Sequence, residues 1–108
     1  MSKKNFDIYL EFNYSKLNLA AFNKLNSQLE YYKEQSYKPY IDSYKELNFD
    51  ELQKLVEKNI IEMEKSIDEF VKDIYLIIET PQTSTIQLSV IKNCLLYLVR
   101  AIIMNLLN

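Results

Sequence analysis

Apolar residues in the middle of the chain recur at steps of three and four, from Leu52 to Ile78. This spacing places them on one stripe of an α-helix. Asn48 is a favourable N-cap, and the acidic residues that follow it would meet the positive end of the helix dipole. Pro81 stops the pattern, because proline disfavours a helical conformation in the residue before it. The pattern predicts a long helix over residues 49–79.

Apolar residues become denser after this proline and leave almost no polar face. A helix of this kind is usually the most buried member of a bundle. We therefore predict a second helix over residues 85–107, which forms the core hairpin with the first. The alternation of Ile86, Leu88 and Val90 with polar residues also fits a short strand, and this is the less favoured alternative.

The first half of the chain holds two further candidate helices. Residues 15–35 place Leu17, Leu25 and other apolar positions on one side of a helix. Pro39 suits the first turn of a short helix that continues to Leu47.

Residues 5–14 are ambiguous. From Phe6 to Phe12 apolar and polar residues alternate strictly, which indicates a strand, yet the same residues can extend the following helix backward. A lone strand would have unpaired edges unless residues 86–90 or a partner protein paired with it. The predicted fold is therefore all-α, an antiparallel bundle of about four helices in one domain over residues 1–108. A short strand over 5–14 is the alternative.

Glycine and histidine are both absent from the 108 residues, although a chain of this length averages roughly seven or eight glycines. Phosphate-cradling loops and dinucleotide-binding turns require glycine. Nucleophile pairs that use histidine, and histidine-ligated zinc, are excluded as well. The carboxylates of residues 49–79 alternate with lysines at helix-stabilising spacing, which favours a solvated face over acid–base catalysis. We expect no enzymatic activity, no cofactor and no metal.

The chain carries no secretory signal at its start, and its longest apolar stretch, residues 95–107, is broken by Arg100 and Asn105. That stretch is too short and too polar to span a bilayer. The single Cys94 cannot form an intramolecular disulfide. These features predict a cytoplasmic protein with no membrane association.

Tyrosine is concentrated in one segment, which holds five of the nine tyrosines: Tyr31, Tyr32, Tyr37, Tyr40 and Tyr44. Tyrosine provides a large contact area with a polar tip and is enriched at interface hot spots. The same rings could instead cover the end of the bundle and pack on the long helix. Lysines between them would suit single-stranded nucleic acid, but neighbouring acids leave the segment nearly neutral, and we expect no nucleic-acid binding.

Negative charge is concentrated in residues 49–80, where nine carboxylates against four lysines give a net charge of −5, compared with −2 for the whole chain. Such charges usually keep a helix soluble, but small acidic inhibitors also use clustered carboxylates to attract cationic partners. The candidate acidic contacts are Glu57, Glu64, Asp68 and Glu69.

Together these features predict a non-enzymatic protein-binding module. The most specific interpretation is a small inhibitor of the immunity or antitoxin type, which caps a toxin or nuclease domain; colicin-type immunity proteins are similar in bulk properties only. Two alternatives are an inhibitor of a host defence enzyme encoded by a phage or plasmid, and a structural module that forms a homodimer through the apolar stripe of residues 85–107. A toxin gene directly upstream would favour the first interpretation, and sedimentation would test the last.

Overall fold

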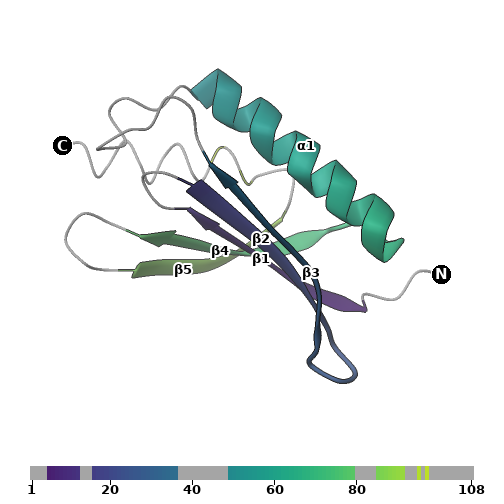
Figure 1. Cartoon of the computed structure of the whole chain (residues 1–108). Helices are drawn as coiled ribbons and strands as arrows, with labels where there is room; N and C mark the ends of the chain where they lie inside the picture. Colours follow the sequence, from purple (N-terminus) through teal and green to yellow (C-terminus); the bar gives the residue numbers. More distant parts are fainter. Residues whose placement is uncertain are drawn as a thin grey trace.

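The predicted all-α bundle is wrong, because most elements of this protein are strands. The computed structural model describes residues 5–12, 16–36, 49–79 and 85–91, together with Leu95 and Tyr97. Within these residues five strands and one helix follow in the order β1 (Phe6–Phe12), β2 (Lys16–Asn23), β3 (Leu29–Ser36), α1 (Phe49–Ile67), β4 (Asp73–Glu79) and β5 (Thr85–Ile91) (Figure 1).

The five strands form one mixed sheet in the order β3-β2-β1-β4-β5. The first three strands form an antiparallel meander, with Leu10 opposite Leu19 and Leu19 opposite Lys33. Helix α1 then separates β3 from β4, which joins the free side of β1 in parallel, and β5 returns antiparallel to β4. Two distant parts of the sequence therefore meet at the β1–β4 pair in the centre of the sheet.

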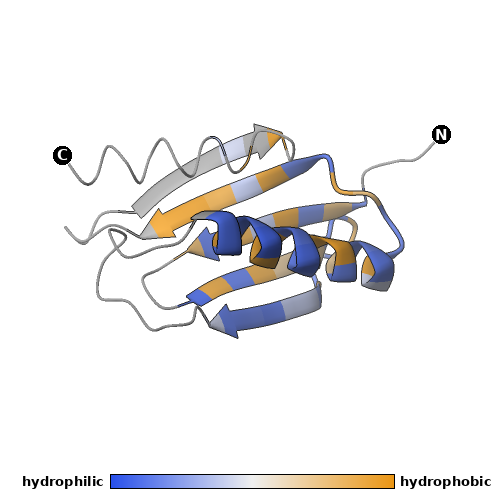
Figure 2. Ribbon diagram, turned by 90° about the horizontal axis from the view of Figure 1, so that it is seen from above, coloured by the Kyte–Doolittle hydropathy of each residue, from blue (hydrophilic) through white to orange (hydrophobic). Residues whose placement is uncertain are grey.

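Helix α1 lies on one face of this sheet (Figures 1 and 2). Alternating residues of β1, β2 and β4 point toward the helix and are buried, and the helix contributes a matching apolar stripe. The core consists of Phe6, Ile8, Leu10, Phe12, Leu17, Leu19, Ala21, Leu52, Val56, Ile60, Met63, Val71, Ile74, Leu76, Ile78 and Leu95. The strand alternation thus produces one helix-covered face and one opposite face.

The strand alternative for residues 5–14 is the correct one over Phe6–Phe12, and the predicted helix over 15–35 is wrong. These residues form β2 and β3, joined by a turn at positions 24–28. Two asparagine side chains support that turn, because Asn23 Oδ1 accepts from the Leu25 N–H at 2.8 Å and Asn26 Oδ1 from the Gln28 N–H at 3.0 Å. Such local bonds are the usual reason that asparagine favours turns over helices.

The predicted long helix begins at Phe49 as expected but ends at Ile67, not at residue 79. Asp68 adopts a left-handed conformation with φ of 55°, which among the non-glycine residues that the structure describes is shared only by Ser27, with φ of 58°. The Glu69 N–H then donates to the Glu64 carbonyl at 3.2 Å, which is the bond of a Schellman C-cap, and Asp68 occupies the position that usually holds glycine. Of the remainder of the predicted helix, Asp73–Glu79 form β4.

The predicted helix over 85–107 is also wrong at its start, where Thr85–Ile91 form β5. The strand alternative for residues 86–90 is therefore correct. Leu95 and Tyr97 are helical, and Leu95 is buried. The proposed short helix after Pro39 and the residues Cys94 and Arg100 lie outside the described residues. No helix in the described part of the chain has the length and apolar character needed to cross a membrane.

Candidate functional site

Aromatic side chains form a row on the sheet face opposite α1. Tyr32 of β3 pairs with Ala20 of β2, Ala20 with Tyr9 of β1, and Tyr9 with Tyr75 of β4. Because side chains directly opposite one another on neighbouring strands share a face, these residues project together. Phe22, two positions after Ala20, lies on the same face. We call Tyr9, Phe22, Tyr32 and Tyr75 the aromatic face.

The Tyr9 ring contacts two of the other rings. The Tyr9 and Tyr75 rings are stacked, with centroids 4.9 Å apart and an interplanar angle of 22°. Phe22 meets Tyr9 in a T-shaped arrangement at 5.5 Å and 90°. Both geometries are favourable for aromatic pairs. The rings therefore form a preassembled surface, and little side-chain freedom remains to be lost on binding.

The aromatic face is accessible to solvent. Tyr32 is 55% exposed and Tyr75 39%, whereas Ile74 and Leu76, the residues on either side of Tyr75, are at most 1% exposed. Tyr9 and Phe22 are half-buried. Leu29 and Ile91 extend the apolar surface at its margin and are also exposed. A contiguous apolar surface rimmed by polar residues commonly marks an interaction site.

Charged residues surround the aromatic face. Among the residues that the structure describes, four carboxylates lie on this face of the sheet, those of Asp7, Glu11, Glu34 and Asp73. Lys16 donates to Glu34 Oε1 at 2.8 Å, and this hydrogen bond raises the pKa of Lys16. Asn18 Nδ2 donates to Glu11 Oε1 at 3.0 Å. With two lysines, Lys16 and Lys24, against four carboxylates, the described rim has net negative charge.

A depression of about 390 Å³ opens at one end of the aromatic face, beside the β2–β3 turn. Its walls are formed by Asp7, Tyr9, Phe22, Asn23, Lys24 and Ser27. Lys24 Nζ lies 3.7 Å from Asp7 Oδ1, an ion-pair distance that is longer than a hydrogen bond. The depression thus combines aromatic walls with one carboxylate and one ammonium group.

The predicted tyrosine segment is divided by the strand geometry. Tyr31 and Tyr32 are consecutive in β3 and therefore point to opposite faces. Tyr31 packs against the core on the helix side, and Tyr32 belongs to the aromatic face. Tyr37, Tyr40 and Tyr44 lie outside the described residues.

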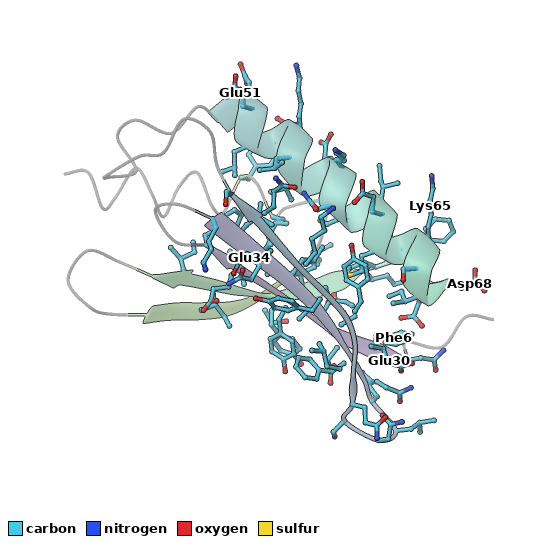
Figure 3. The ribbon with its side chains drawn as sticks, viewed as in Figure 1. Phe6, Glu30, Glu34, Glu51, Lys65 and Asp68 are labelled. Atoms are coloured by element: carbon cyan, nitrogen blue, oxygen red, sulfur yellow. The ribbon has the colours of Figure 1, made fainter. Side chains whose placement is uncertain are left out.

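The predicted acidic contacts lie on α1 and around its C-terminal end, and so are separated from the aromatic face by the sheet. Glu57 is exposed and accepts a hydrogen bond from Gln53 Nε2 at 3.1 Å. Glu64 Oε2 accepts from the Val71 N–H at 2.8 Å, and Glu69 Oε1 from the Asn5 N–H at 2.9 Å. Asp68 follows the end of the helix (Figure 3). Glu64, Asp68 and Glu69 therefore have structural roles in the α1–β4 connection.

Sequence reasoning missed Tyr9, Phe22 and Tyr75 as candidate binding residues. The alternation of apolar and polar residues could have identified Tyr9, because Tyr9 lies between Ile8 and Leu10 in a strand pattern. An aromatic residue at a polar position of that pattern points away from the core.

No group of three or more histidine, cysteine, aspartate or glutamate side chains in the described part of the chain could hold a metal ion. Comparisons with protein families, curated proteins and solved structures gave no match to this chain. The arrangement of the aromatic face is therefore the main guide to function.

Proposed function

We propose that this chain is a non-enzymatic protein-binding module that acts through its aromatic face. The observation that carries the proposal is the row of Tyr32, Tyr9 and Tyr75 on the face that α1 does not cover, with Tyr32 and Tyr75 exposed and Tyr9 half-buried between them. Tyrosine is among the residues that contribute most to protein interfaces. A surface built on paired strands is also rigid, which lowers the entropic cost of association.

Within this class we propose a small cytoplasmic inhibitor of the immunity or antitoxin type, which caps a toxin domain. The support is electrostatic, because the carboxylates around the aromatic face match a cationic surface, and many toxin domains that act on nucleic acid are cationic. The aromatic rings would supply the desolvated centre of the interface and the carboxylates its polar rim.

The test compares two variants as bait in the native host. Tyr32→Ser combined with Tyr75→Ser removes the two most exposed rings of the aromatic face, and Ile61→Ser is the control because Ile61 is 51% exposed on α1. A captured protein is purified and its affinity for each variant is measured by calorimetry. We expect the double variant to bind at least about tenfold more weakly, as loss of interface hot spots predicts, and the control to bind as the original chain does.

A functional assay completes the test. The captured protein should arrest growth when expressed alone, and co-expression of the original chain, but not of the double variant, should restore growth. Circular dichroism establishes that both variants remain folded. Equal affinity of the double variant and the control, or a partner whose activity the chain leaves unchanged, would overturn the proposal.

A further inference from the structure

We propose that the depression beside the β2–β3 turn is a socket for an arginine side chain presented by the partner protein. This inference rests on the proposed function and specifies the chemistry of the partner. It comes from two features of the depression, its aromatic walls and the carboxylate of Asp7, and from the net negative charge of the described sheet face around it.

The aromatic walls suit a planar cation. Phe22 and Tyr9 meet at 90°, with ring centroids 5.5 Å apart, and both line the depression. A guanidinium group stacks on aromatic rings and is attracted by their electron-rich faces. It is also more weakly hydrated than an ammonium group, so that arginine loses less hydration than lysine on entering such a site.

Asp7 provides the acceptor for this cation. Its side chain is half-buried and projects from β1 on the same face as Tyr9. The ion pair of Asp7 with Lys24 is 3.7 Å long and involves an exposed lysine on the turn. A guanidinium group would form two parallel hydrogen bonds with the carboxylate and displace the Lys24 ammonium, because a bidentate pair is stronger than a loose ion pair.

The charge around the site favours a basic protein over nucleic acid. The described residues of this face carry four carboxylates, which repel phosphate, and the chain has a net charge of −2. Nucleic-acid affinity depends mainly on neutralisation of phosphates by lysine and arginine. Stacked aromatic rings alone do not provide that neutralisation.

Substitution of Asp7 and substitution of Lys24 should change the affinity for an arginine side chain in opposite directions, and this difference tests the proposal. The probe is acetyl-arginine amide, added to the isotope-labelled full chain and followed by NMR. We expect saturable shifts at the amides of Asp7, Phe22 and Ser27. Asp7→Asn should weaken the affinity at least about threefold through loss of the charged acceptor. Lys24→Met should strengthen it about twofold or more, since a competing cation is removed.

Matched controls isolate the guanidinium. Acetyl-citrulline amide has nearly the same shape without the charge and should produce no saturable shifts. Glu57→Gln removes an exposed carboxylate on α1 and should leave the affinity for the arginine probe unchanged. Equal shifts with the citrulline probe, or weaker binding of the arginine probe to Lys24→Met, would overturn the inference. Saturable binding of a single-stranded oligonucleotide that is lost in Lys24→Met would overturn it in favour of an anionic ligand.

This experiment is independent of the partner captured in the host. If Tyr32→Ser with Tyr75→Ser abolishes partner binding while Asp7→Asn has no effect on it or on the arginine probe, the proposed function stands and the arginine socket fails. If the arginine probe binds as expected but no partner depends on the aromatic face, the proposed function fails and the socket remains.

Discussion

The Lys33 ammonium group on edge strand β3 lies 2.9 Å from Glu62 Oε2 on α1, and so links the edge of the sheet to the helix that covers it. The two side chains are 36% and 40% exposed. Their hydrogen bond raises the pKa of Lys33 and lowers the pKa of Glu62. Solvent weakens ion pairs of this kind, so we expect this pair to contribute little to the stability of the fold.

Replacement of Lys33 by methionine keeps the aliphatic stem and removes the charge. We expect a decrease in Tm of no more than a few degrees at pH 7, as for other solvent-exposed pairs. The lowered pKa of Glu62 contributes stability above its ordinary value of 4.5, and the raised pKa of Lys33 contributes stability below its ordinary value of 10.5. The difference in Tm between the original chain and the Lys33→Met variant should therefore become smaller below pH 4.5 and above pH 10.5.

Lys54→Met is the control for this comparison, because Lys54 is exposed on the same helix. NMR titration gives a second measurement, in which Lys33→Met should return the pKa of Glu62 toward its ordinary value and Lys54→Met should not. A pH-independent difference in Tm would show that the packing of the lysine stem, and not its charge, is responsible.

Two positions in the described ranges of the chain use a left-handed conformation without glycine. Ser27 has φ of 58° and Asp68 has φ of 55°. This conformation is costly for most residues that carry a Cβ atom and costs glycine almost nothing. Ser27→Gly and Asp68→Gly should each raise the free energy of unfolding by about 0.5–1 kcal/mol in urea titrations. Lys54→Gly, within α1, should lower it by about 1 kcal/mol, and stabilisation by all three would contradict the conformational explanation.

The same two positions explain much of what could not be predicted from the sequence. No glycine marks the end of α1 at Asp68 or the β2–β3 turn at Ser27, because both positions carry another residue. Apolar residues continue at helical spacing beyond Ile67 by coincidence, since Ile74, Leu76 and Ile78 also alternate as a strand should. Spacing alone does not distinguish the two when no glycine or proline marks the boundary.

Local sequence patterns predicted the start of a helix more reliably than they predicted the pairing of strands. The start of α1 at Phe49 was predicted correctly. The alternation of β1 was visible in the sequence, but it was compatible with a helix as well, and the strand was only the alternative there. Strand pairing depends on distant segments, and β1 is stable as a central strand only because β2 and β4 cover both its edges. The candidate site was missed for the same reason, because the row from Tyr32 to Tyr75 exists only in the folded register.

Asn59 is a buried polar residue on the core side of α1, with 1% of its surface exposed. Its Nδ2 donates to the Leu55 carbonyl at 2.8 Å, while its Oδ1 has no hydrogen-bond partner in the described part of the structure. A buried polar atom without a partner lowers stability.

Asn59→Leu, which replaces the amide by an apolar group of similar size, should raise the free energy of unfolding by about 1 kcal/mol. Asn59→Asp should lower it, and more strongly as the pH rises above about 4, the ordinary pKa of an aspartate side chain, because the charged carboxylate is costly to bury. A less stable Asn59→Leu variant would instead indicate that the amide is fully bonded in solution.

The Tyr9–Tyr75 stack joins the two parts of the chain that meet at the parallel β1–β4 pair, and it lies on the surface proposed to bind a partner. A double-mutant cycle with Tyr9→Leu and Tyr75→Leu measures the stack itself, since leucine retains a β-sheet-compatible apolar side chain. We expect a coupling free energy of about 0.5–1.5 kcal/mol, the range of aromatic pairs.

The matched control cycle combines Tyr32→Leu with Tyr75→Leu. These two residues lie in the same row but are separated by Ala20 and Tyr9, so the effects of the two substitutions should be additive. Coupling in both cycles would mean that leucine alters the sheet as a whole. Coupling in the first alone would establish that the rings are held in place before any partner arrives, as a preassembled binding surface requires.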